Sequence, residues 1–87
     1  MVPRTKKFRY DIIRDIAVLE ENASEAGNVY RKELKEVAYN GKPPVYDLRT
    51  WSYLNTGEVR LGKGITFTWE ELKILRIVLN DMRELDD

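Results

Sequence analysis

The chain has 87 residues, of which 43% are hydrophobic and 34% are charged, and its 15 basic and 15 acidic groups give a formal net charge of zero. This length fits one small domain, and the composition is that of a folded protein rather than a disordered one. The absence of cysteine and histidine excludes disulfides, thiolate chemistry, the commonest nucleophile–base pairs and most zinc sites.

The charges are unevenly distributed along the chain. Residues 1–14 carry five basic and one acidic group (+4), residues 15–30 four acidic groups (−4), residues 31–64 seven basic and four acidic groups (+3), and residues 65–87 three basic and six acidic groups (−3). We expect residues 1–7 to form a basic flexible tail and residues 8–87 a single domain. The positive excess falls on the tail and on expected strands, and a basic sheet beside an acidic helix is compatible with nucleic acid on the sheet.

The segment 8–21 fits two kinds of secondary structure. Phe8, Ile12, Ile16 and Leu19 recur at helical spacing, which indicates an amphipathic helix. As a strand, the segment would place most of its apolar residues on one face, interrupted by Arg14. Periodicity alone favours the helix.

Three further strands are expected between residues 29 and 67. Residues 29–39 alternate in the manner of a strand and end at an Asn-Gly turn. A third strand follows over residues 45–52, and the turn residues at 55–57 reverse the chain. A short fourth strand is expected over residues 64–67.

Alternation in the third expected strand separates two chemically different faces. Tyr46, Leu48 and Thr50 lie on one face, which suits a hydrophobic core. The other face places the cation of Arg49 next to the large flat ring of Trp51. A cation beside a ring is suited to holding a phosphate backbone while stacking a base.

The last element is predicted to be a helix that runs to about Leu85. Thr68 and Glu71 have the spacing of a capping box at its start. Its apolar positions form a stripe too wide for packing on one sheet, so we expect one part to pack on the sheet and the rest to meet a second copy of the chain. The expected dimer interface consists of Leu72, Leu75, Val78, Leu79 and Met82.

The chain resembles the transcriptional positive cofactor 4 family, and in particular its bacterial YdbC-like branch. The resemblance covers residues 8 to about 79 and rests on Arg31-Lys32-Glu33-Leu34, on Tyr46-Asp47-Leu48-Arg49-Thr50-Trp51-Ser52, and on Gly62-Lys63-Gly64-Ile65-Thr66 before the capped helix. It implies an α+β fold in which a curved, four-stranded antiparallel sheet precedes one C-terminal helix (ββββα), with homodimerisation through the helices. It also implies that residues 8–21 form a strand.

The resemblance further implies binding of single-stranded DNA, or of locally melted duplex, across the sheet without strong sequence preference. On matching positions, Arg49 and Trp51 would contact the nucleic acid, Lys63 and Gly64 would contact its backbone, and Tyr39 would add an aromatic ring. Two further candidates come from the chain itself, because Lys35 shares a strand face with Tyr39 and Lys42 stands in the following turn. The expected nucleic-acid-binding set is therefore Lys35, Tyr39, Lys42, Arg49, Trp51, Lys63 and Gly64.

Each of these residues also has a purely structural interpretation. Trp51 would then belong to the core, Arg49 would form a surface ion pair with an acid such as Glu33, and Lys63 would stand in an ordinary turn. Trp69, at the helix start, is expected to pack the helix against the sheet.

Two features depart from the family pattern. The connection Glu58-Val59-Arg60-Leu61 is less basic than in eukaryotic members, and their activating low-complexity tail is absent. We expect a cytoplasmic, non-enzymatic homodimer without metal, cofactor or membrane contact that binds single-stranded DNA in transcription, replication or repair, together with protein partners in those processes. The alternatives are RNA as the ligand, or a protein-interaction dimer that does not bind nucleic acid.

Overall fold

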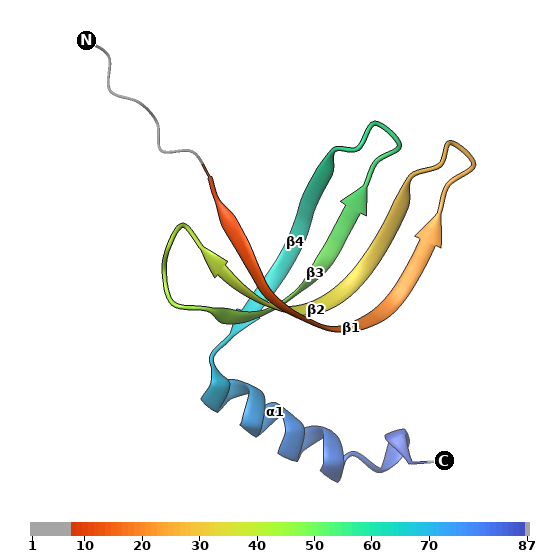
Figure 1. Ribbon diagram of the computed structural model, residues 1–87. Helices are drawn as coiled ribbons and strands as arrows, with labels where there is room; N and C mark the ends of the chain where they lie inside the picture. The colour runs from red at the N-terminus through yellow and green to blue at the C-terminus, as the bar shows by residue number, and fades with distance from the viewer. Residues whose placement is uncertain (1–7, 87) are drawn as a thin grey trace.

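A computed structural model describes residues 8–86 of the chain, so the expected basic tail lies outside the described residues (Figure 1). The four strands form one antiparallel sheet in the order β1-β2-β3-β4, and a helix follows. This arrangement confirms the expected ββββα fold. The elements are β1 (Tyr10–Ala23), β2 (Val29–Tyr39), β3 (Val45–Tyr53), β4 (Val59–Phe67), α1 (Trp69–Asp81) and a 3₁₀ turn η1 (Arg83–Leu85).

The predicted ends of two elements were wrong. The fourth strand begins at Val59 rather than at Gly64, because Val59 and Leu61 pair with residues of β3. Two glycines in this segment lower its strand propensity, which hid the strand from the sequence pattern. The helix ends at Asp81 rather than near Leu85, because Met82 adopts an extended backbone (φ −79°, ψ 110°).

The first segment is a strand, as the resemblance implied, and the helix favoured by periodicity was wrong. β1 uses 14 residues where β2 uses 11. The difference lies in three bulges, at Ile13, Ile16 and Leu19, which have no partner in the register. Every third residue of β1 therefore lies on the same face of the sheet as every second residue of β2. A repeat of three residues is close to the spacing of a helix, which explains the wrong prediction. The matched pairs are Ile12–Val37, Asp15–Lys35, Val18–Glu33 and Glu21–Arg31.

The sheet is strongly curved, and α1 lies on its convex side (Figure 1). The expected core face was wrong, since Tyr46 and Leu48 point to the helix side but remain only half-buried. On the concave side, Val37, Asp47 and Trp51 are fully buried. Curvature explains the difference, because side chains inside a bend converge and cover one another.

The helix is capped as predicted but is loosely packed. The backbone N–H of Glu71 donates to Thr68 Oγ1 (3.1 Å), and the N–H of Thr68 donates to Glu71 Oε1 (2.8 Å). No residue of α1 is buried. Trp69, expected to pack on the sheet, is 56% exposed and has Lys73 Nζ 3.8 Å from its ring centroid. One part of the helix does lie against the sheet, since Leu72 and Leu75 are half-buried beside Leu34 of β2, but this packing is loose in a single chain.

Apolar side chains remain exposed along the helix. Leu72, Leu75 and Leu79 line an open groove together with Leu34 of β2. The exposed apolar side chains of α1 and η1 are Trp69, Ile74, Ile77, Val78, Leu79 and Leu85. Within residues 8–86, no helix has the length and apolar character needed to cross a membrane.

Candidate nucleic-acid interface

The concave face carries a series of cations stacked on aromatic rings. Strand alternation places every second residue of β2 and of β3 on this face, and the antiparallel register brings the two sets side by side. Such contacts are attractive because the face of an aromatic ring is electron-rich. The described pairs are Arg31 Cζ over Tyr53 (5.3 Å to the ring centroid), Lys35 Nζ over Trp51 (5.0 Å) and Arg49 Cζ over Tyr39 (5.5 Å).

Asp47 holds the third of these pairs, Arg49 and Tyr39, by hydrogen bonds to both residues. Its buried carboxylate accepts hydrogen bonds from Arg49 Nε (2.8 Å) and Nη2 (2.6 Å), and from the Tyr39 hydroxyl (2.8 Å). Hydrogen bonding to Asp47 raises the pKa of Arg49, although burial opposes the shift. Burial, and then the hydrogen bond to Asp47, raise the pKa of Tyr39 well above its usual value. The acid that pairs with Arg49 is thus Asp47, whereas Glu33 was the example expected from the sequence.

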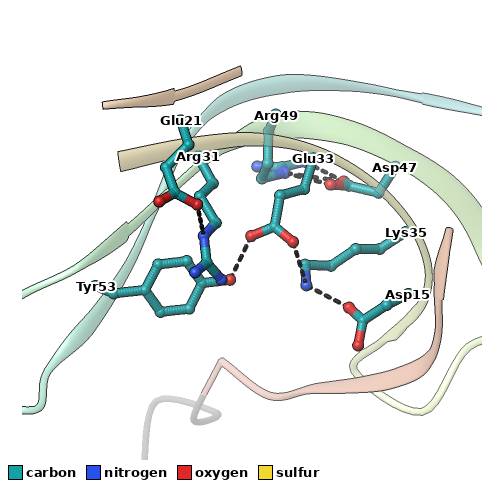
Figure 2. Close-up of polar contacts among 8 residues, drawn as sticks. All are labelled: Asp15, Glu21, Arg31, Glu33, Lys35, Asp47, Arg49 and Tyr53. Atoms are coloured by element: carbon teal, nitrogen blue, oxygen red, sulfur yellow. Dashed lines mark hydrogen bonds and ion pairs between the residues drawn. The ribbon is translucent and has the colours of Figure 1, made fainter. Parts of the chain in front are cut away.

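A second network surrounds Lys35 (Figure 2). Its Nζ lies 2.5 Å from Asp15 Oδ1 and 3.0 Å from Glu33 Oε1, and the Tyr53 hydroxyl donates to Glu33 Oε2. The Lys35 side chain is only 4% exposed. Burial is the largest effect on the pKa of Lys35 and lowers it, but the hydrogen bonds to Asp15 and Glu33 outweigh burial and the pKa is raised. Lys35 therefore stays charged inside the network.

Trp51 is closed off from solvent in this conformation. The Lys35 chain covers one side, and the Tyr10 ring packs edge-on against the indole (5.4 Å between centroids, 67° between planes). The indole Nε1 is buried and has no hydrogen-bond partner among residues 8–86. Trp51 thus occupies a core position, as its structural interpretation held, and no base can reach its ring without a movement of its neighbours.

Gly64 serves the packing of Arg49. The two residues are partners in the β3–β4 register, and a Cβ added at Gly64 would overlap Arg49 Cβ and lie 2.6 Å from the carbonyl oxygen of Leu48. Arg49 Nη1 also donates to the carbonyl of Gly62 (3.0 Å). A glycine is therefore needed at position 64 to make room for the Arg49 side chain, which lies over Gly64 on the concave face.

The two remaining predicted contacts are exposed. Lys63 lies in β4, and Lys42 lies in the tight turn between β2 and β3, whose residues Asn40 and Gly41 have positive φ (53° and 75°). The structure thus brings five predicted residues together on or against the concave face and leaves two cations on the open surface. The grouped residues are Lys35, Tyr39, Arg49, Trp51 and Gly64.

Sequence reasoning missed several members of this site. Arg31 and Tyr53 follow from alternation, because Arg31 lies four residues before Lys35 and Tyr53 two residues after Trp51 on the same face. The Arg31 guanidinium pairs with Glu21 Oε1 (2.7 Å). Asp15 and Glu21 were hidden because the bulges of β1 change which of its residues face β2. Every cation of the series therefore has a carboxylate partner, namely Glu21 for Arg31, Asp15 and Glu33 for Lys35, and Asp47 for Arg49.

The site offers flat rings and paired cations on one curved face. Among residues 8–86, no group of three or more potential ligand side chains is placed to hold a metal ion. No protein-family model matches the chain. The chain is 39% identical over 75 residues to a protein of Treponema pallidum (strain Nichols) that is described as uncharacterized, and the match covers 86% of this chain and 80% of that relative.

Proposed function

This chain belongs to the same family as the uncharacterized Treponema pallidum protein, and on that premise we propose that it is a non-enzymatic homodimer that binds single-stranded nucleic acid on the concave face of its sheet. We also propose that both proteins are members of the transcriptional positive cofactor 4 family in the broad sense. The preferred ligand would be DNA, in single-stranded or locally melted form, met in the cytoplasm during transcription, replication or repair.

The observation that supports this proposal best is the series of cation–ring pairs on one curved face. Proteins that bind single strands without sequence preference combine rings on which bases stack with cations that neutralise phosphates. Here Arg31, Lys35 and Arg49 each lie within 5.5 Å of a ring centroid. Lys42 and Lys63 add exposed positive charge for sequence-independent attraction.

The exposed apolar helix supports the dimer. An isolated amphipathic helix gains most of its stability from burial of its apolar face. In the single chain no residue of α1 is buried, and Ile77 and Val78 are 57% and 49% exposed. A second copy is a natural partner, because a two-fold interface places the same patch on both sides. Leu72, Leu75, Val78, Leu79 and Met82 remain the proposed interface.

One observation favours a second candidate function. The positive charges of Arg31, Lys35 and Arg49 on the concave face are neutralised by carboxylates of the same chain. A face without free positive charge suits a protein-interaction dimer that has no affinity for nucleic acid. The two functions differ in their response to oligonucleotides and to salt.

Fluorescence anisotropy of a labelled oligo(dT) of about 20 nucleotides would test the proposal, with the matching duplex and oligo(U) as competitors. We expect binding that survives duplex competition and weakens with salt, with a slope of log affinity on log salt of about −0.7 per neutralised phosphate. Effective competition by oligo(U) would assign RNA as an equal ligand. A folded protein that does not bind oligo(dT) even at low salt would refute nucleic-acid binding and leave the protein-interaction dimer.

Matched lysine variants locate the binding face. Lys42→Ala and Lys63→Ala should each weaken binding and reduce the salt slope by about 0.7. Lys32→Ala removes the same charge from the opposite face of β2, since Lys32 alternates with Arg31 and Glu33. Equal losses in all three variants would contradict binding on the concave side.

A further inference from the structure

Trp51 is a buried ring on the concave face of the sheet, the face on which, within residues 8–86, the helix does not lie. The helix lies on the convex side (Figure 1), yet the exposure of Trp51 is 0%. Among residues 8–86, the Lys35 side chain lies over the ring and the Tyr10 ring packs against it edge-on. A cover of this kind can move without unfolding any part of the sheet.

The Lys35 cover is held in place by carboxylates of two strands. Glu33 lies beside it on β2, and Asp15 reaches it from the edge strand β1. Figure 2 shows Lys35 Nζ between these two carboxylates. Asp15 is itself 73% exposed. One of the two contacts that hold Lys35 is therefore directly accessible from solvent.

The covered state leaves one polar group unused. The Trp51 Nε1–H is buried without a hydrogen-bond partner among the described residues, whereas a buried indole N–H normally has one. The closed arrangement therefore does not satisfy Trp51 fully. A ligand that offers a hydrogen-bond acceptor, such as a phosphate or a base carbonyl, could provide the partner that this N–H lacks.

We infer that Lys35 is a lid over Trp51, that Asp15 holds the lid closed, and that a single-stranded nucleic acid opens it. This inference rests on the proposed function. In the open state a phosphate replaces Asp15 as the partner of Lys35, and the uncovered indole becomes available for a base and for a hydrogen bond from Nε1. The free protein is thus restrained by its own acidic side chain, and removal of that acid should strengthen binding.

The first test compares two variants that remove the same charge from the same strand. Asp15→Asn removes the negative charge that pairs with Lys35, while Glu33 keeps Lys35 paired and the fold intact. Asp11→Asn is the matched control, because Asp11 pairs with Ala38 and lies on the other face of β1. We expect Asp15→Asn to bind oligo(dT) about two- to fivefold more tightly than wild type, as for loss of an exposed ion pair, and Asp11→Asn to differ less.

The second test follows the lid directly. In a Trp69→Phe background, Trp51 is the only tryptophan, so its fluorescence reports its own surroundings. We expect weak quenching by acrylamide in the free protein, stronger quenching when Asp15→Asn is added, and a loss of intensity on binding of oligo(dT) as a base stacks on the ring. Circular dichroism of each variant checks that the fold is kept.

The outcomes of these tests distinguish failure of the lid from failure of the proposed function. Equal affinities of Asp15→Asn and Asp11→Asn, in a protein that binds oligo(dT), would overturn the lid and leave the proposed function standing. Binding without any change in Trp51 fluorescence would do the same, because the ligand would then lie elsewhere. Failure of wild type and of Asp15→Asn to bind at low salt would refute both the proposed function and the ligand-opened lid.

Discussion

Gly64 lies directly opposite Arg49 in the pairing of β3 and β4, and the Arg49 side chain fills the space that a side chain at Gly64 would need. The close contacts involve Arg49 Cβ and the backbone carbonyl of Leu48, neither of which can rotate away. Relief would therefore require a shift of the strands. The glycine and the arginine thus act as one packing unit.

Gly64→Ala should lower the free energy of unfolding by about 1–3 kcal/mol, the usual range for overpacking. Urea denaturation followed by far-ultraviolet circular dichroism measures this change. Lys63→Ala is the control at the neighbouring exposed position and should stay within about 0.5 kcal/mol of wild type. Equal stabilities of the two variants would show that β4 shifts freely and would contradict the packing unit.

Removal of the Asp47 carboxylate should lower the free energy of unfolding more than most other polar substitutions on the concave face. Asp47→Ala leaves Arg49 and the Tyr39 hydroxyl without their shared acceptor. We expect a loss of about 3 kcal/mol, at the lower end for a broken buried pair because Arg49 is 17% exposed. Tyr39→Phe removes one hydrogen bond and should cost about 1 kcal/mol.

The control for Asp47 is an exposed pair. Glu58 contacts Arg60 at 3.0 Å, but both side chains are more than half exposed (54% and 65%), so Glu58→Ala should cost less than about 1 kcal/mol. Urea denaturation of all three variants gives the comparison. A cost for Asp47→Ala no larger than that for Glu58→Ala would mean that the Arg49 network adds little stability.

Stability should fall in alkaline solution because of Tyr39. Its pKa in the folded chain is raised above the ordinary value of 10.0, first by burial and then by the hydrogen bond to Asp47. The folded state therefore keeps a proton that the unfolded state loses, so the contribution is complete below pH 10 and is lost as the pH rises through the folded pKa. The slope from one such group is about 1.4 kcal/mol per pH unit.

Urea denaturation between about pH 8 and 11.5 measures this loss. Tyr53 and Lys35 also have raised pKa values and add to the decrease with the same sign. The decrease should therefore be shallower in Tyr39→Phe than in wild type without vanishing. An identical pH dependence in the two proteins would contradict the assignment to Tyr39.

The exposed helix predicts the effect of a charge placed on it. Val78→Asp should weaken self-association about tenfold or more, because an ionised carboxylate would be buried against apolar side chains. Thr56→Asp makes the same charge change in the exposed turn between β3 and β4, away from α1, and should leave association intact. Light scattering after gel filtration measures the mass, which we expect to be twice the chain mass of 10.3 kDa for wild type. A monomeric wild-type protein would rule out the helix dimer.

The sequence predicted the middle of the sheet better than its first strand. The bounds of β2 follow from alternation that ends at Asn40-Gly41, and the start of β3 follows from the same turn. β1 could not be recognised from periodicity, because bulges at Ile13, Ile16 and Leu19 replace the two-residue repeat of a strand by a repeat of three.

The burial of the concave face was also beyond the reach of the sequence. Lys35 and Asp47 are charged, and charged residues are almost never fully buried unless they are paired. Arg49 and Glu33 lie two residues from Asp47 and Lys35 on the same strands, whereas the cross-strand register brings Asp15 of β1 to Lys35 across 20 residues of sequence. The rings and cations of the site could therefore be assigned to one face, but the β1 carboxylates that pair with two of those cations, Asp15 and Glu21, could not be found.

The bulges of β1 also make the two edges of the sheet unlike each other. An edge strand exposes backbone N–H and C=O groups on which a strand of another chain can pair, and bulges interrupt that regular row. The β1 edge is interrupted at three places along its 14 residues. β4 has a single register irregularity, between its pairs with Arg49 and Trp51. The bulged β1 edge is therefore better protected from edge-to-edge aggregation than the more regular β4 edge.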